Sequence, residues 1–275
     1  SSLVTNRLTP IFVDIDEKSF NLNPKNIEKL ITQKTSAILP VHVFGNACEV
    51  EKIEQIAKKH RLKVVYDAAH AFDVKYKDKS ILEFGDISTL SFHATKLFHT
   101  IEGGAIISND DELAQKIRYL INFGIKNSTE IAYLGTNAKM NEFEAAMGLC
   151  VLDDIENIKE KRKIIIENYR EELKDLVQFQ KQNENASENY SYFPIVLKSE
   201  EQLLKVQKAL NDKNIFPRRY FYPSLDTLEY IEPKQECKIS RDISKRILCL
   251  PVYVELDFDN QKKIIYIIKE KLSGW

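Results

Sequence analysis

The feature that most constrains the fold is an alternation of short apolar runs with amphipathic stretches over the first half of the chain. The apolar runs, which we expect to form strands, are residues 11–15, 37–43, 63–66, 87–92 and 105–107. Between them, residues 50–60 and 110–122 have helical spacing, and a shorter helix is expected at residues 26–32, with Asn23 as N-cap and Pro24 in its first turn. Parallel strands need such crossover connections, because a tight hairpin joins only antiparallel neighbours. The first half therefore predicts an α/β domain with a mainly parallel sheet.

The second half has a different pattern. Residues 141 to about 176 have helical spacing without a Pro, and a run of that length often links two lobes. Residues 180–190 are polar, which favours an exposed loop or a boundary. The remaining expected elements are a strand at 192–197 and helices at 200–210 and 260–272. The chain thus predicts a large domain over residues 1–150, then a linking helix and a small C-terminal α+β domain over residues 151–275.

Composition excludes several classes of protein. The chain has 40 Lys and Arg residues against 41 Asp and Glu residues, so no global field would attract nucleic acid. No apolar run approaches the roughly 20 residues of a membrane span, and the start of the chain has no signal-peptide pattern. The four cysteines form no CxxC pair, which argues against a zinc site and a disulfide scaffold. We therefore expect a soluble, cytoplasmic protein without a metal ion.

Two polar positions stand out against this framework. Asp67 follows the apolar run 63–66, and the carboxyl ends of strands are where open α/β sheets bind ligands. Lys96 lies in a polar loop between two expected strands, shortly before the pair Gly103 and Gly104. A lysine with room around it suits a Schiff-base cofactor, and a carboxylate can pair with the pyridine nitrogen of pyridoxal phosphate (PLP). For an isolated Asp at a strand end, the alternative is a turn or helix cap.

Longer motifs carry a family resemblance. The stretches DAAHAF and GDISTLSFHATKLFHTIEGGAIISNDDELAQKIR, together with PVHVFGN, GTNAKMNEFEAAMG, YPSL and LCLPVY, resemble the DegT/DnrJ/EryC1/StrS sugar aminotransferases. This family is a branch of the aspartate-aminotransferase fold, and the resemblance extends over almost the whole chain. The family's N-terminal segment, with a phosphate-binding turn and an aromatic residue that stacks on the cofactor ring, has no counterpart here. Either the chain is part of a longer protein or it cannot hold the cofactor properly.

The resemblance implies a role for individual residues. Lys96 matches the lysine that holds the cofactor as a Schiff base and then moves the proton. Asp67 matches the partner of the pyridine nitrogen, and His70 falls where the family places a Gln or His against the cofactor ring. Ser91 matches a hydroxyl that binds the cofactor phosphate. Asn137 matches an asparagine that reaches the phosphate from a neighbouring subunit, which implies a homodimer with a shared active site.

Other residues are weaker candidates for substrate binding. His93 could touch substrate, although a His in a polar loop is more often solvated or hydrogen-bonded. Lys139 stands where many relatives carry Arg, and a lysine lacks the planar fork for bidentate contacts. Arg218 and Arg219, followed by Tyr220, could bind a donor carboxylate or a nucleotide diphosphate.

Three further signals favour structural roles. His42 and Cys48, near the turn at Gly45, are more typical of packing or turn positions than of ligands. The charged run 159–163 is more typical of a solvated helix face.

The implied reaction is PLP-dependent transamination of a nucleotide-linked keto-6-deoxyhexose to an aminosugar nucleotide for a surface glycan such as lipopolysaccharide O-antigen. The resemblance favours dTDP-4-keto-6-deoxyglucose as substrate and glutamate as amino donor. One alternative is amination at C3, and another is an inactive homologue with a binding or regulatory role. A sugar 3-dehydratase of this family would carry His in place of Lys96.

Overall fold

The computed structural model describes residues 1–273, which form two compact units. Unit 1 comprises Ser1–Thr35, Asn157–Glu184 and the chain from Tyr190 to the end of the described residues. Unit 2 comprises Ser36–Glu156 and the short segment Asn185–Asn189. Within residues 1–273, no helix is both long and apolar enough to cross a membrane.

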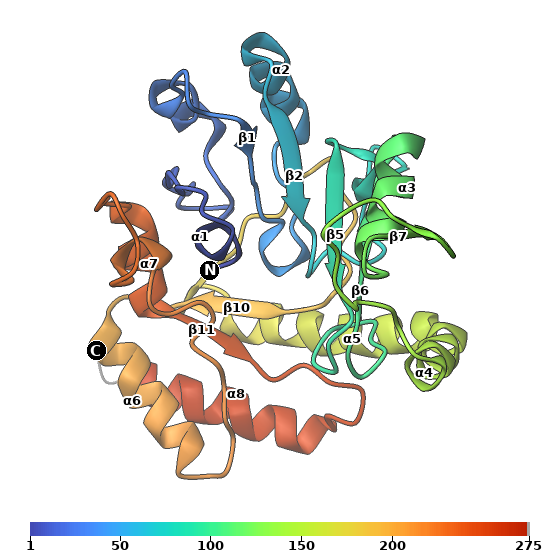
Figure 1. Cartoon of the computed structure of the whole chain (residues 1–275). Coiled ribbons are helices and arrows are strands. Elements are labelled where there is room, and N and C mark those ends of the chain that lie inside the picture. The colour runs from blue at the N-terminus through green and yellow to red at the C-terminus, as the bar shows by residue number, and fades with distance from the viewer. Residues whose placement is uncertain (274–275) are drawn as a thin grey trace. The chain divides into compact units, whose positions relative to one another are not determined.

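Unit 2 is built around a four-stranded sheet (Figure 1). Its strands are β1 (Ala37–Ile38), β2 (Lys63–Asp67), β5 (Ile87–Ser91) and β6 (Gly104–Ile107), in the order β1-β2-β5-β6. The first three are parallel, and β6 runs antiparallel to β5. Its helices are α2 (Val50–His60), α3 (Asp111–Leu120) and α4 (Glu142–Asp153), and small hairpins are formed by β3 (Lys75–Tyr76) with β4 (Lys79–Ser80) and by β7 (Ile125–Asn127) with β8 (Glu130–Ile131). The predicted mainly parallel sheet is confirmed.

Local sequence explains why α2 and β2 form where they do. The helix buries Val50, Ile53 and Ala57, which lie three and four residues apart on one face. It ends because Arg61 turns into the left-handed conformation, with φ 54°. The strand then alternates exposed and buried positions, as expected for a sheet with one covered face.

The strand expected at residues 37–43 is much shorter than predicted. Only Ala37 and Ile38 form β1, and Val41 pairs with Asp67 as an isolated bridge. Pro40 between them has no N–H to give to a ladder, although its carbonyl oxygen accepts from Asp67 N at 2.9 Å. The chain then bends into the 3₁₀ turn η3 (Val43–Gly45).

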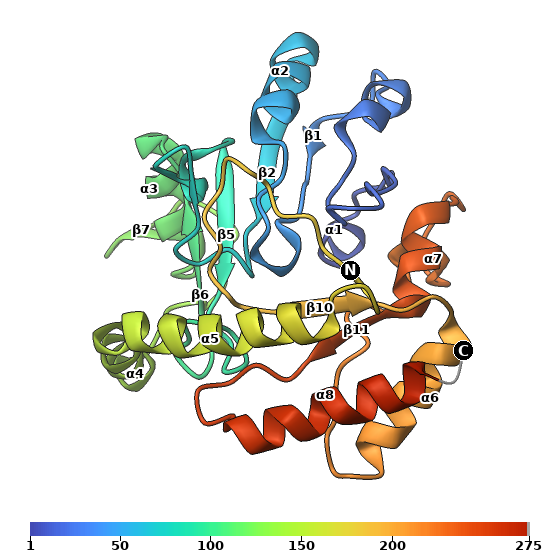
Figure 2. The same ribbon diagram turned by 180° about the vertical axis from the view of Figure 1, so that it is seen from behind.

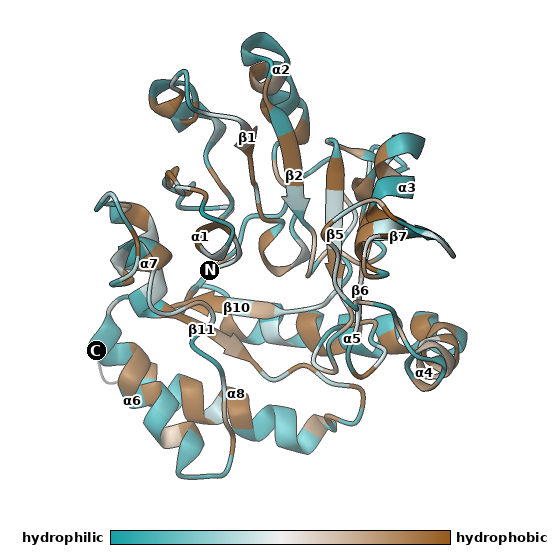
Figure 3. Cartoon of the chain, in the orientation of Figure 1, coloured by the Kyte–Doolittle hydropathy of each residue, from teal (hydrophilic) through white to brown (hydrophobic). Residues whose placement is uncertain are grey.

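Unit 1 contains an antiparallel sheet of β9 (Gln178–Phe179), β10 (Phe193–Val196) and β11 (Ile247–Leu250), in the order β11-β10-β9 (Figure 2). Its helices are α1 (Ser2–Thr5), most of α5 (Ile155–Leu173), α6 (Glu200–Asn211), α7 (Lys238–Arg246) and α8 (Phe258–Leu272). The apolar faces of α5, α6 and α8 pack with β10 and β11 in one core, in which Ile195, Leu248 and Ile268 are fully buried. Figure 3 shows β10 and β11 as mostly apolar, whereas α6 and α8 carry apolar and polar faces. The expected α+β pattern of this region is confirmed.

The expected helical run from residue 141 to about 176 is two helices. α4 ends at Asp153, and the backbone of Asp154, with φ −107° and ψ 3°, leaves the helical region before α5 begins. Asp is a poor helix former, and its negative charge is unfavourable at a helix C-terminus. The pair Asp153-Asp154 therefore ends the first helix.

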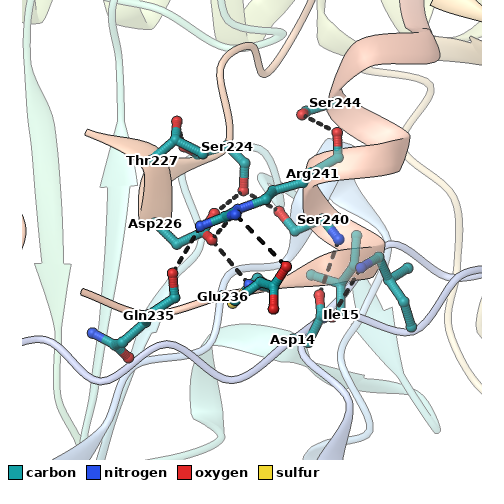
Figure 4. A network of polar contacts seen from close by, with 12 residues as sticks. Asp14, Ile15, Ser224, Asp226, Thr227, Gln235, Glu236, Ser240, Arg241 and Ser244 are labelled. Atoms are coloured by element: carbon teal, nitrogen blue, oxygen red, sulfur yellow. Dashed lines mark hydrogen bonds and ion pairs between the residues drawn. The ribbon is translucent and has the colours of Figure 1, made fainter. Parts of the chain in front are cut away.

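Residues 11–15 do not form the expected first strand. Phe12 N donates instead to Gln235 Oε1 at 2.6 Å. The Asp14 carboxylate accepts from Ile239 N at 2.9 Å and from Ser240 N at 2.9 Å, and Figure 4 shows Asp14 with Ser240. Through these hydrogen bonds, residues 11–15 are attached to the start of α7 in unit 1. Residues 1–35 thus group with C-terminal segments, unlike the predicted domain 1–150.

The helix expected at residues 26–32 is replaced by two 3₁₀ turns, η1 (Pro24–Asn26) and η2 (Glu28–Leu30). The predicted cap is confirmed, because the Asn23 side chain accepts from Lys25 N. Two other 3₁₀ turns of the chain are η4 (Ile81–Glu83) and η5 (Leu225–Thr227).

Candidate active site

Two polar side chains lie at the carboxyl ends of adjacent parallel strands in unit 2. Asp67 is the last residue of β2 and pairs in register with Thr89 of β5, and Ser91 ends β5 two residues later. Both are partly exposed, at the edge where open α/β sheets bind ligands. One carboxylate oxygen of Asp67 accepts from Ala69 N at 3.0 Å, so Asp67 also organises the turn that follows the strand.

Lys96 lies in the loop that connects β5 to β6. Phe92 closes this loop, because its N–H donates to Gly103 O at 2.8 Å and its carbonyl oxygen accepts from Thr100 N at 2.9 Å. Inside the loop, Lys96 N donates to His93 O at 2.9 Å. The half-buried Lys96 is therefore held on a short, closed loop at the strand ends.

Gly103 is required by the shape of that loop. Its φ of +153° is in the range that favours glycine, and an added Cβ would lie 2.4 Å from Thr100 Oγ1. The Thr100 hydroxyl in turn donates to Glu102 O at 2.6 Å. The glycine noted in the sequence thus allows the close return of the chain.

His70 follows the turn after β2 and is buried. Its Nδ1 accepts from Phe44 N at 3.1 Å, so the proton of the neutral ring lies on Nε2. Burial, and then the positive charge of Lys96, lower the pKa of His70 to about 3. The ring is therefore a neutral N–H donor at any physiological pH, and the charge of Lys96 acts on it.

His93 lies in the lysine loop but is half exposed. Its Nδ1 is 2.8 Å from Thr95 Oγ1, and its Nε2 is 3.5 Å from a carboxylate oxygen of Glu102. The backbone N–H of His93 donates to Ser91 Oγ at 3.4 Å. His93 is thus hydrogen-bonded within its loop, whereas its contact with substrate stays a prediction.

Asn137 and Lys139 lie together on the exposed surface of unit 2. Lys139 Nζ donates to Asn137 Oδ1 at 2.7 Å and lies 4.4 Å from the centre of the Phe123 ring. Asn137 also forms an isolated bridge with Asn122. Lys139 therefore orients the amide of Asn137, and the predicted reach of Asn137 into a neighbouring subunit stays a prediction.

Arg218, Arg219 and Tyr220 lie in unit 1 and differ in their surroundings. Arg219 Nη2 donates to Glu200 Oε1 at 2.6 Å and to a backbone carbonyl, and its guanidinium lies 3.8 Å from the centre of the Tyr222 ring. The charge of Arg219 is thus matched within the fold. The side chain of Arg218 is exposed, while its backbone pairs with Cys249 on β11. Of the two, Arg218 is the better candidate to bind an anion.

Sequence reasoning misplaced Arg162, which it assigned to the solvated face of the charged run 159–163. Its Nε donates to Tyr190 O at 2.9 Å and its Nη2 donates to Ser191 O at 2.6 Å. Burial lowers the pKa of Arg162 to about 10. Helical spacing could have revealed this, because Arg162 lies four residues before the buried Ile166 and seven before the buried Tyr169.

The structural roles expected for His42 and Cys48 are confirmed. The His42 ring stacks on Tyr66 with centroids 4.7 Å apart, and its Nδ1 accepts from Cys48 N at 3.0 Å. Burial lowers the pKa of His42 to about 3 and raises that of the Cys48 thiol. Both groups are therefore neutral at neutral pH.

Unit 2 therefore brings together an amine, a carboxylate, a hydroxyl and a neutral N–H donor, from Lys96, Asp67, Ser91 and His70. PLP requires an amine for its aldehyde, a carboxylate for its ring nitrogen and hydrogen-bond donors for its oxygens. The residues present fit this cofactor. Within the described residues, no group of three or more His, Cys, Asp or Glu side chains could hold a metal ion.

Comparison with known proteins agrees with this geometry. The model of the DegT/DnrJ/EryC1/StrS aminotransferase family matches residues 1–269. The chain is 44% identical over 276 residues to a dTDP-4-amino-4,6-dideoxy-D-glucose transaminase of Shigella dysenteriae, a match that covers 98% of this chain and 75% of that protein. It is 33% identical to a GDP-perosamine synthase of Escherichia coli O157:H7, over 94% of this chain and 71% of that protein.

A solved structure gives the same result for the fold. The crystal structure of DesI in the presence of its TDP-sugar product matches with a TM-score of 0.92 and 31% identity, and the match covers 99% of this chain and 72% of that one. The predicted PLP-transferase fold is therefore confirmed. The chain belongs to the DegT/DnrJ/EryC1/StrS aminotransferase family and is a PLP-dependent aminotransferase.

Proposed function

We propose that this chain transfers an amino group to C4 of a nucleotide-linked keto-6-deoxyhexose, with dTDP-4-keto-6-deoxyglucose as acceptor and glutamate as donor. The observation that carries the proposal is that Lys96 lies on the closed loop after β5, next to the strand ends that carry Asp67 and Ser91, and that its charge acts on the buried ring of His70. The choice of sugar is supported by the relative named for dTDP-4-amino-4,6-dideoxy-D-glucose, at 44% identity.

Each residue has a distinct task in this proposal. Bound PLP supplies an electron sink for the carbanion that forms when the substrate carbon loses its proton. Lys96 would hold the cofactor covalently at rest, and its released amine would take the proton from the donor carbon and later return one to the sugar carbon. Asp67 would face the ring nitrogen, Ser91 would serve the phosphate, and His70 would offer its Nε2–H to the cofactor.

We also propose that two chains pair to complete the active site. Leu134 and Phe143 are 99% and 88% exposed, and Leu149 on the same helix as Phe143 is 65% exposed. Exposed large apolar side chains are candidates for an interaction surface. A partner copy placed there would bring its own Asn137 region to the interface.

The cellular setting that we propose is the cytoplasm. All four cysteines, at positions 48, 150, 237 and 249, are free thiols. Thiols persist in a reducing compartment, which agrees with this setting.

The proposal is tested on the purified chain with added PLP and borohydride. We expect an absorption band of the bound cofactor, and a reduced adduct that peptide mapping places on Lys96. Replacement of Lys96 by Ala should remove the adduct and lower the transamination rate at least about 10³-fold, because the nucleophile and the proton carrier are lost together. NMR of the sugar product distinguishes C4 from C3 amination.

The exposed Lys75 on β3 gives a matched control, since Lys75→Ala should keep both the adduct and the rate. A wild-type chain that fixes no PLP would contradict the proposed role of Lys96 and the proposed sugar reaction, and would favour a binding role. An adduct with a product aminated at C3 would correct only the position of the reaction.

A further inference from the structure

Asn189 is buried although it lies near the end of the polar segment 180–190, which the sequence predicts to be exposed. Connecting segments normally run over the protein surface, yet Asn189 is only 1% exposed. Its Nδ2 donates to His70 O at 2.8 Å and to Phe72 O at 2.9 Å. A single amide therefore fixes two backbone carbonyls on either side of Ala71.

The space for this amide is provided by Gly45. A Cβ added at Gly45 would lie 2.5 Å from Asn189 Oδ1 and 2.9 Å from His70 O, and the φ of +87° favours glycine. Just before it, Phe44 has φ 61° and donates its N–H to His70 Nδ1. The ring of His70 is thus held by Phe44 N, and the peptide of His70 is held by Asn189.

We propose that Asn189 is a positioning residue that sets the orientation and the tautomer of His70 toward the cofactor on Lys96. The step to the cofactor rests on the proposed function, whereas the step from Asn189 to His70 stands on the hydrogen bonds alone. Without the amide, one buried and one partly buried carbonyl lose a donor, and the turn that carries His70 relaxes toward other acceptable geometries. The bond from Phe44 N to Nδ1, which keeps the proton on Nε2, then weakens.

The charged group that acts on the His70 ring is Lys96, whose charge adds to burial in lowering the pKa of His70. A ring that moves toward solvent would lose part of this effect. Its pKa would then rise toward the ordinary value of about 6.5. The orientation of His70 can therefore be read from its ring nitrogens without any cofactor.

The first test compares wild type with Asn189→Ala by ¹⁵N NMR of histidine-labelled chain without PLP, with His70 signals assigned through His70→Gln. We expect a fixed neutral Nε2–H ring in wild type between pH 6 and 8, and mixed tautomers or protonation in the variant. We also expect the PLP dissociation constant to rise about tenfold, the equivalent of one hydrogen bond. The exposed Asn185 in the same segment supplies the control Asn185→Ala, which should change neither quantity.

Asn189→Asp separates positioning from folding, because it keeps the size of the side chain. An ionised carboxylate cannot donate to the two carbonyls, whereas a protonated one can donate to one of them. Relative to wild type at each pH, PLP binding by this variant should be weak at pH 8 and recover partly at pH 5.

The possible outcomes are distinct. An unchanged His70 tautomer and an unchanged PLP dissociation constant in Asn189→Ala would overturn the proposal, even if the melting temperature falls. Wild-type binding by Asn189→Asp at pH 8 would overturn it as well. Failure of the proposed function has a different signature, in which wild type itself fixes no PLP on Lys96 while the NMR comparison still reports on His70.

Discussion

The sheets of the two units differ in how many of their strand residues are buried. In unit 1, every residue of β10 and β11 is buried, and the helices of that unit cover the apolar side chains. In unit 2, β5 buries only Ser88 and β6 buries none of its four residues. The sheet of unit 1 therefore serves mainly stability. The β5–β6 part of unit 2 leaves polar groups accessible at its strand ends, where Lys96 and Ser91 lie.

The buried polar groups of the two units also differ in their role. In unit 1, the Asp226 carboxylate accepts from Ser224 Oγ, Cys237 N and Arg241 Nε, so its lone pairs are used within the fold (Figure 4). In unit 2, the buried ring of His70 lies within reach of the charge of Lys96. The first arrangement holds loops onto α7, and the second keeps the ring of His70 a neutral donor under the charge of Lys96.

The largest expected effect on stability is in the sheet of unit 1. Ile195→Ala removes a fully buried side chain from β10, so the free energy of unfolding should fall by about 2–5 kcal/mol. Ile106→Ala on β6 is the matched control, because Ile106 is 49% exposed and its loss should cost about 1 kcal/mol or less. Chemical denaturation measures both, and equal losses would contradict the contrast between the two sheets.

An intermediate effect is expected at Asp226. Asp226→Asn removes the charge that Arg241 faces and weakens three hydrogen bonds, so unfolding should cost about 1–3 kcal/mol less than in wild type. Asp212→Asn is the control, because Asp212 pairs with Lys208 on the exposed surface and its change should have little effect. The comparison fails if the two variants lose stability to the same extent at pH 7.

Acid titration of stability sharpens the same point. Burial acts to raise the pKa of Asp226, but hydrogen bonds from Ser224, Cys237 N and Arg241 outweigh it and hold the pKa below its ordinary value. The stabilisation is thus complete above the unfolded pKa of about 3.9 and is lost as the pH falls through the folded pKa. Denaturation curves from pH 7 to pH 2 should therefore lose part of their acid dependence in Asp226→Asn, and an unchanged slope would show that Asp226 is not the titrating group.

The smallest effect on folding is expected at the exposed apolar surface of α4. Phe143 is 88% exposed, so Phe143→Ser should change the free energy of unfolding of the dilute chain by no more than about 0.5 kcal/mol. Sedimentation at higher concentration should nevertheless shift toward the monomer, because the proposed dimer surface loses an aromatic contact. An unchanged dimer fraction would place the partner elsewhere.

Local patterns were sufficient for several elements. The helix α2 and the strand β2 were predicted at their observed positions, because helical spacing and alternating burial are written into neighbouring residues. The prediction of a strand at residues 11–15 was wrong. A strand needs a neighbouring strand as hydrogen-bond partner, whereas Phe12 N donates to the side chain of Gln235. The helix that was expected to continue past Asp154 ended there. The prediction relied on the absence of Pro, but the pair Asp153-Asp154 also ends a helix.

The sequence by itself determined the family, the chemical types at the site and a mainly parallel sheet in the first half of the chain, because motifs and periodicity are properties of the chain. The tertiary structure alone decided which buried polar groups meet. Asn189 and His70 are 119 positions apart, and Arg162 binds backbone oxygens 28 and 29 positions away. Such contacts depend on the depth and direction of each side chain after the core has closed, and no local pattern encodes them.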